Sequence, residues 1–215
     1  MKTRPILFSA PMVHAILDGT KTQTRRIVRG AGGSVAVTKD VIGTQPNDLW
    51  WIAGAEAGGS SSFVRCPYGL PGDHLWVRET WALLTGNGHR LVYRADGEPI
   101  TNDPQTGKRV PVDPMRWTPS IFMRRHQSRI TLEITSVRVE RLQAITEEDA
   151  RAEGIHEFRL PNGSIFGVQG VRGDDVGSTA VEAYATLWDQ INASRAPWSS
   201  NPWVWVVSFK RLEGT

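Results

Sequence analysis

The chain has 215 residues, of which 40% are hydrophobic and 22% are charged, and it carries a net charge of +3 at pH 7. This length allows one large domain or two small ones, and folding then buries roughly 70% of the unfolded surface, so we expect a full hydrophobic core. This composition is close to the average of globular proteins, which argues against a disordered, collagen-like or membrane protein. In addition, no apolar run approaches the roughly 20 residues of a spanning helix. We therefore expect a cytoplasmic protein without a secretory signal.

Three counts stand out in the composition. Cys66 is the only cysteine, which excludes an internal disulfide and a multi-cysteine zinc site. Of the 25 basic residues 20 are arginine, and the chain has nine tryptophans. Guanidinium groups grip phosphates and stack on bases, so these biases indicate a nucleic-acid or nucleotide partner, although a GC-rich genome gives the same arginine excess.

The first half of the chain predicts one helix and several short strands. In chain order, the expected elements are a helix at 10–19, a strand or extended loop at 20–28, a Gly- and Ser-rich stretch at 30–59 with short strands at 35–37 and 50–52, a strand at 74–81, a short strand at 91–95 and a loop at 96–114. The helix has apolar residues at helical spacing and ends at Gly19.

The second half predicts longer elements. In chain order, they are a strand at 128–142, a short helix from 147 to a stop at Gly154, a Gly-rich loop at 161–178, a helix at 179–191 and a strand at 203–212. The strand at 128–142 breaks its alternation once near Thr135 and Ser136, as a β-bulge would. Thr146 has the residue type and position of a helix N-cap.

Helices flanking several strands predict an α+β fold, with a small mixed or antiparallel β-barrel at its centre. The three Gly-rich stretches are interpreted as loop insertions in a compact core, so residues 1–215 are expected to form a single domain. No internal repeat is visible in the sequence.

The densest polar cluster is the segment 19–26, GTKTQTRR, directly after the first predicted helix. It is not a phosphate-binding loop, because it lacks the Gly-x-x-x-x-Gly-Lys order. If the segment is extended, Lys21 and Thr24 point in opposite directions, although a twist or bulge beside Gly19 brings them together. The simplest interpretation is a solvated strand end.

The pattern Gly19-x-Lys21-x-x-x-x-Arg26 after an amphipathic helix resembles the signature of the ASCH family (activating signal cointegrator homology). Further segments agree with it: ILF at 6–8, PGDHLWVRE at 71–79, RITLEI at 129–134 and WVWVVSF at 203–209. The resemblance covers roughly 5–29, 71–81, 128–154 and 179–212, and the whole chain looks like the larger ASCH-like proteins of phages and prophages.

The resemblance implies a PUA-like barrel that binds RNA, and a bacterial branch of the family hydrolyses N4-acetylcytidine with a Lys, a Thr and a Glu. Residue by residue, these fall on Lys21, Thr24 and Glu153 of this chain. Glu79 is an extra acid that competes for the role of Glu153. The implied partner is a nucleoside, a nucleotide or RNA, including single-stranded nucleic acid, and no cofactor is implied.

These residue types also suit amide hydrolysis by their own chemistry. A Thr hydroxyl attacks an amide only if a base takes its proton, and a desolvated Lys that is partly neutral can serve, or when charged can stabilise an oxyanion. We assign Thr24 as nucleophile, Lys21 as its activator and Glu153 as acid/base. In an equally coherent scheme Glu153 activates a water and Thr24 only positions it.

Seven further residues are candidates for binding the substrate or a nucleic acid: Arg26, Arg78, Glu79, Trp81, Arg124, Arg125 and Arg129. Arg26 is either a phosphate contact or a structural strand-end residue. Arg78, Glu79 and Trp81 suit a cradle for a base, or else form an internal Arg–Glu pair beside a core Trp. The arginines at 124, 125 and 129 suit phosphates, with Arg129 alternatively buried against Glu79.

Other residues are interpreted as structural. The five histidines lack metal-ligand spacing, so no metal site is expected. Trp188, Trp198, Trp203 and Trp205 are expected to pack in the core. Two rival functions stay open, a non-catalytic RNA- or DNA-binding module and a ribonuclease, although no histidine pair suits the acid–base steps of the latter. The sequence does not specify an oligomeric state.

Overall fold

A computed structural model describes residues 1–29, 36–39, 49–53, 62–86, 88–103, 105–111, 116–168 and 176–212. They form a mixed α+β fold in which strands predominate. Much of the predicted Gly- and Ser-rich stretch, at 30–35, 40–48 and 54–59, lies outside the described residues. Among those that are described, no helix is both long and apolar enough to cross a membrane.

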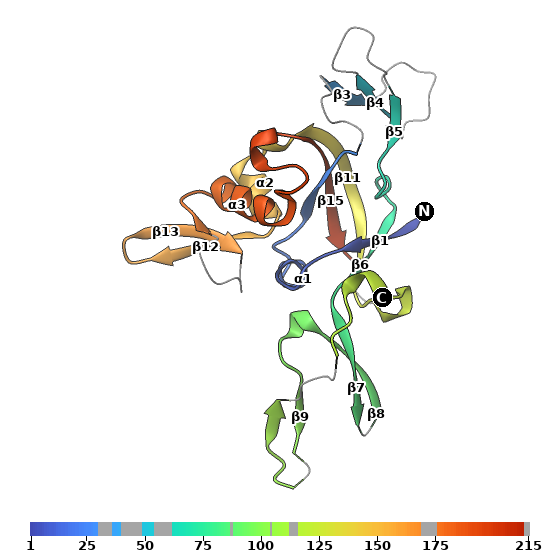
Figure 1. The fold of residues 1–215 in the computed structure, drawn as a ribbon, viewed down its shortest axis with the longest axis vertical. Helices are drawn as coiled ribbons and strands as arrows, with labels where there is room; N and C mark the ends of the chain where they lie inside the picture. The colour runs from blue at the N-terminus through green and yellow to red at the C-terminus, as the bar shows by residue number, and fades with distance from the viewer. Residues whose placement is uncertain are drawn as a thin grey trace.

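A five-stranded sheet forms the centre of the fold, in the order β1-β6-β11-β15-β2 (Figure 1). Its strands are β1 (Thr3–Leu7), β6 (His74–Arg78), β11 (Thr131–Arg141), β15 (Trp203–Arg211) and β2 (Gln23–Ile27). β1 and β6 are parallel and the other neighbours are antiparallel. The register of β11 against β15 shifts between Ile134 and Ser136, which confirms the predicted bulge.

The predicted barrel does not close. Closure requires every strand to have two neighbours, and in the described sheet β1 and β2 are edges that do not pair with each other. A side chain links these edges instead, because Arg26 Nη2 on β2 donates to the main-chain oxygen of Leu7 at the end of β1, 2.7 Å away. The prediction of a barrel was wrong on closure, whereas the α+β class is confirmed.

Three α-helices accompany the sheet: α1 (Ala10–Leu17), α2 (Glu147–Ala152) and α3 (Ala180–Asn192). α1 ends before Gly19, whose φ of 76° turns the chain into β2. Thr146 caps α2 by accepting from the amide of Asp149, and Thr179 caps α3 by accepting from the amide of Glu182. The three predicted helices and the Thr146 cap are confirmed.

Smaller sheets extend from the centre (Figure 1). They contain β3 (Ala36–Lys39), β4 (Leu49–Ala53) and β5 (Ser62–Arg65); β7 (Trp81–Gly86) and β8 (Gly88–Tyr93); β9 (Ile100–Asn102) and β10 (Arg109–Pro111); and β12 (Ile155–Leu160), β13 (Gly163–Val168) and β14 (Val176–Gly177). Five short 3-10 helices complete the described elements: Arg94–Asp96, Ser120–Phe122, Arg125–Gln127, Leu142–Ala144 and Trp198–Ser200.

Three sequence expectations fail in these smaller sheets. The predicted loops at 96–114 and 161–178 contain strands, because β9, β10 and β14 are two or three residues long and β13 is Gly-rich, so none shows an alternating pattern. The strand predicted at 74–81 divides into β6 and β7, since the chain leaves the central sheet after Arg78.

Contacts within the protein involve several of the arginines and tryptophans. Trp188 and Trp205 are buried, as predicted for packing residues. Many arginines stack on aromatic rings within the protein: Arg78 on Trp76 at 4.6 Å, Arg94 on Trp117 at 5.2 Å, Arg141 on Trp203 at 4.4 Å and Arg129 on Tyr93 at 4.0 Å. These cation–π contacts stabilise the fold itself and require no nucleic acid.

Candidate active site

A cavity of about 470 Å³ lies where the edges of the open sheet approach each other. Its walls come from the end of β1, the start of α1, β2 and α3. The charged and hydroxyl side chains that line it include all three residues predicted to be catalytic. The polar lining consists of Ser9, Lys21, Thr24, Arg25, Arg26, Thr80, Ser120, Glu153, Tyr184 and Asn192. The remaining lining residues are apolar and include the aromatic rings of Phe8 and Trp188.

Lys21 is held in this cavity by the turn that follows α1. Its amide donates to the Ala15 main-chain oxygen at 2.9 Å, which fixes the chain directly after the helix. Its Nζ donates to the main-chain oxygen of Glu153 at 2.7 Å and to Glu153 Oε2 at 2.8 Å. Gly154 permits this approach, because its φ is 97° and a Cβ there would lie 3.1 Å from Ala15 and 3.4 Å from Lys21.

Burial governs the protonation of Lys21. The residue is 3% exposed, and loss of hydration lowers its pKa below the usual value for lysine. The charge and hydrogen bond of Glu153 oppose this shift, and the positive charges of Arg26 and Arg25 reinforce it. The neutral amine is therefore reached at a lower pH than at an exposed lysine, as a general base requires.

Thr24 reaches the same cavity from β2, where it pairs with Val207 of β15. Only 4% of the residue is exposed. Because regular β2 begins at Gln23, Lys21 lies before the strand, and strict alternation does not separate Lys21 from Thr24. Both side chains line one cavity with Glu153, so the three predicted catalytic residues are brought together.

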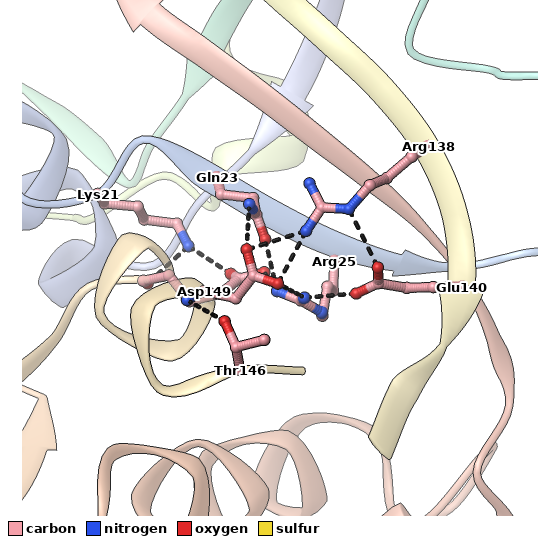
Figure 2. A network of polar contacts seen from close by, with 8 residues as sticks. Lys21, Gln23, Arg25, Arg138, Glu140, Thr146 and Asp149 are labelled. Carbon is pink, nitrogen blue, oxygen red and sulfur yellow. Dashed lines mark hydrogen bonds and ion pairs between the residues drawn. The ribbon is translucent and has the colours of Figure 1, made fainter. Parts of the chain in front are cut away.

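Arg25 is a component of the site that the sequence did not indicate. Its side chain is fully buried, and it donates to Gln23 at 2.5 Å, Glu140 at 2.6 Å and Asp149 at 2.8 Å, with Glu153 Oε1 at 3.5 Å (Figure 2). Burial disfavours its charge, but the carboxylates of Glu153 and Glu140 hold its pKa above the usual value for arginine.

Arg138 completes this network by donating to Glu140 at 3.0 Å and to both oxygens of Asp149 at 2.9 and 2.8 Å (Figure 2). The cations Lys21, Arg25 and Arg138 thus meet three carboxylates: Glu140, Asp149 and Glu153. Balanced charge is what makes such burial tolerable. Through Arg25 the network contacts Glu153 Oε1, whereas Lys21 contacts Oε2.

Arg26 and Arg78 occupy different environments. Arg26 lines the cavity and lies over the Phe8 ring at 5.3 Å. Arg78 stacks on Trp76 and donates to the main-chain oxygen of Ile121 at 3.2 Å, and it does not line the cavity. Trp81 is half-buried and also lies outside the cavity lining. The predicted base cradle of Arg78, Glu79 and Trp81 is therefore separate from the Lys21 cavity.

Glu79 pairs with Arg129, whose Nε and Nη2 lie 2.9 and 3.0 Å from its two carboxylate oxygens. Arg129 also donates to Asp96 at 2.8 Å. Glu79 does not line the cavity, so in this structure it does not compete with Glu153. Arg124 and Arg125 are exposed, and Arg125 donates to the Thr131 hydroxyl at 3.3 Å.

Comparisons with known proteins do not identify the chain, since no protein-family model, curated protein or solved structure matches it. Among the described residues, no group of three or more His, Cys, Asp or Glu side chains is arranged to hold a metal ion. The site itself offers a hydroxyl, a desolvated amine and a carboxylate beside apolar side chains.

Proposed function

We propose that the chain is an amidohydrolase that deacylates N4-acetylcytidine or a related acylated cytosine nucleoside or nucleotide. The observation that carries the proposal is the meeting of Lys21, Thr24 and Glu153 in one cavity, with Lys21 and Glu153 2.8 Å apart. The sequence resemblance to ASCH-like amidohydrolases supports the same three residues. The fold and the chemistry of the site are compatible with this reaction.

The proposed reaction proceeds through an acyl-enzyme. Thr24 Oγ attacks the acetyl carbonyl carbon while neutral Lys21 Nζ takes the hydroxyl proton. The bond between the carbonyl carbon and N4 then breaks, and the proton passes from Lys21 through Glu153 to N4, which leaves as the cytidine amino group. Water, deprotonated by Glu153, then attacks the carbonyl carbon of the Thr24 ester. The bond from that carbon to Thr24 Oγ breaks, Glu153 returns the proton to Oγ, and acetate is released.

The alternative scheme uses the same residues without an acyl-enzyme. Glu153 takes a proton from a water, which attacks the acetyl carbon directly, and Thr24 donates a hydrogen bond that orients the water or the substrate. The bond between the acetyl carbon and N4 then breaks, and Glu153 returns the proton to N4, so that acetate and cytidine leave. Charged Lys21 stabilises the oxyanion in this scheme. The two schemes differ in one observable, a covalent acetyl group on Thr24.

The cavity suits a small planar substrate. Its volume lies within the roughly 300–1,000 Å³ typical of small-molecule sites. The Phe8 and Trp188 rings supply flat apolar surface, and the Arg26 guanidinium supplies a donor for the carbonyl or phosphate oxygens of a nucleotide.

Hydrolysis of N4-acetylcytidine, followed by chromatography of the released cytidine, tests the proposal. We expect turnover that falls about 1,000-fold in Lys21→Met and Thr24→Val, within the range for lost acid–base or nucleophilic groups. Lys210→Met and Thr22→Val are matched controls at exposed positions and should retain activity. Absence of turnover in the wild type, or undiminished turnover in both cavity variants, would contradict the proposal.

Mass spectrometry of the enzyme during turnover separates the two schemes. An acetyl adduct that is present in the wild type and absent in Thr24→Val indicates the acyl-enzyme route. Turnover without an adduct, together with a smaller loss in Thr24→Val than in Glu153→Gln, indicates that Glu153 activates water.

A nucleic-acid-binding module is the second candidate. Ser120 lines the cavity, and the exposed Arg124 and Arg125 follow it along the chain, so a strand of RNA entering the cavity would pass near them. This function predicts binding that weakens steeply with salt, because phosphate contacts release counterions. A ribonuclease is less well supported, since no histidine lines the cavity in the described part of the chain.

A further inference from the structure

The hairpin of β12 and β13 has an outer edge that is unpaired in the described part of the chain. β12 is an end strand of its sheet, which runs β12-β13-β14. Figure 1 shows the hairpin extending away from the central sheet beside α3. Phe158 and Leu160 on this strand are 36% and 51% exposed, and Glu157 and Arg159 are exposed as well. An edge with apolar side chains favours pairing with another strand.

The backbone of β12 limits which residues can pair with a new strand. In an antiparallel ladder, successive residues direct their N–H and C=O groups alternately toward one neighbour and away from it. A two-residue turn joins Leu160 to Gly163, so the backbone groups of Leu160 and Phe158 face β13. Those of Glu157 and Arg159 consequently face the outer edge.

The charges on β12 select one way for two copies of this strand to pair. A twofold axis at Glu157 would set two carboxylates opposite each other, and an axis at Arg159 would set two guanidinium groups opposite each other. An axis at Phe158 sets Glu157 of each copy opposite Arg159 of the other, and these are the residues whose backbone groups face outward. Opposite charges directly across a ladder stabilise it, whereas like charges destabilise it.

We propose that two copies of this chain associate through antiparallel pairing of their β12 strands about a twofold axis at Phe158. In this register the two Phe158 rings meet on one face of the joined sheet, and each His156 lies opposite Leu160 of the second copy. Glu157, which accepts a hydrogen bond from Ser164 within its own chain at 2.6 Å, gains a charged partner. Pairing of the two strands does not depend on the proposed catalytic activity.

A charge-swap experiment tests this register. Sedimentation equilibrium of the full-length wild type should show a dimer, and Glu157→Arg or Arg159→Glu should raise its dissociation constant by at least about tenfold, because two attractive pairs become repulsive. The double variant Glu157→Arg/Arg159→Glu should restore the dimer. A monomeric wild type, or single variants that dimerise as the wild type does, would overturn the proposal.

A cysteine at the axis provides a second, structural readout. Phe158 and its copy would form a non-hydrogen-bonded pair with Cα atoms about 4.5 Å apart, which lies within disulfide range. Phe158→Cys should therefore form a covalent dimer under mild oxidation. Val176→Cys, exposed on β14 at the opposite edge, is the matched control, and the native Cys66 is buried. Equal crosslinking of both variants, or none at Phe158→Cys, would exclude this register.

Discussion

Glu153 and Glu79 are two buried glutamates with cationic partners, at 3% and 1% exposure, yet their surroundings differ. Glu79 is clasped by the two nitrogens of the Arg129 guanidinium and does not line the candidate cavity. Glu153 is shared between Lys21 and Arg25 and lines a cavity together with Thr24. Burial of a carboxylate beside a cation is therefore common to both, and access to a ligand-sized space distinguishes them.

The two glutamates also differ in their cationic partners, which are Arg129 for Glu79 and Lys21 for Glu153. An arginine stays protonated throughout the accessible pH range and can only hold a charge in place. A lysine whose pKa is lowered by burial can gain and lose a proton, so the Lys21–Glu153 pair is able to move one. Burial raises the pKa of Glu79, and Arg129 opposes that shift without fully cancelling it. We infer that the Glu79–Arg129 pair is structural.

The most severe test of the comparison replaces each glutamate by its amide. Glu153→Gln should lower kcat/KM for N4-acetylcytidine by about 1,000-fold, because the proton acceptor is lost while the shape of the side chain is kept. Glu79→Gln should leave kcat/KM within about threefold of the wild type. A large loss of activity in a folded Glu79→Gln protein, or none in Glu153→Gln, would reverse the assignment of the two sites.

Local sequence patterns account for the parts of the fold that depend on neighbouring residues. The Thr146 cap, the bulge after Ile134 and the stop at Gly19 each depend on a few adjacent positions, and all three are present. The sequence does not predict that the sheet stays open, because closure depends on how β1 and β2 approach each other in space. The short strands β9 and β10 carry too few residues to show a period.

In the candidate site, too, local sequence patterns do not predict contacts between residues that are far apart in the chain. A resemblance to known motifs predicts Lys21, Thr24 and Glu153, and nothing in their own spacing shows that they share a cavity. The sequence does not indicate the role of Arg25, because its partners Glu140 and Asp149 lie 115 and 124 residues away in the chain. The residues next to Arg25 in the sequence do not indicate that its side chain is buried. Its contacts in the folded chain show this directly.

The second test addresses the structural role of the Glu79 pair. Arg129→Met should lower the free energy of unfolding by about 3 kcal/mol, because it leaves Glu79 buried beside an apolar side chain. Urea denaturation measures this change, with Arg124→Met as a control at an exposed position. The double variant Glu79→Met/Arg129→Met should recover much of the loss, since it leaves no unpaired charge. Equal stability of Arg129→Met and the wild type would show that the pair contributes little.

The smallest expected effect concerns Asp149, which supports the Glu153 side of the comparison through Arg25. Burial disfavours its charge, but hydrogen bonds from Gln23 and Arg138 and the charge of Arg25 lower its pKa to about 2 from an ordinary value of 3.8. A carboxyl group with a depressed pKa in the folded state stabilises the protein above its unfolded pKa, and this contribution disappears as the pH falls toward 2. The wild type should therefore lose stability between about pH 4 and pH 2.

Asp149→Asn should make the unfolding free energy less dependent on pH in this window, because the asparagine amide does not titrate there. Unfolding by urea at several pH values measures the slope, and the slope is more informative than absolute stability, since the variant also loses charged hydrogen bonds to Arg25 and Arg138 at every pH. Glu148→Gln, an exposed neighbour on α2, is the matched control and should keep the wild-type slope. If Asp149→Asn also keeps the wild-type slope, the network does not hold the Asp149 carboxylate ionised. The inference that Asp149 supports Glu153 through Arg25 would then be wrong.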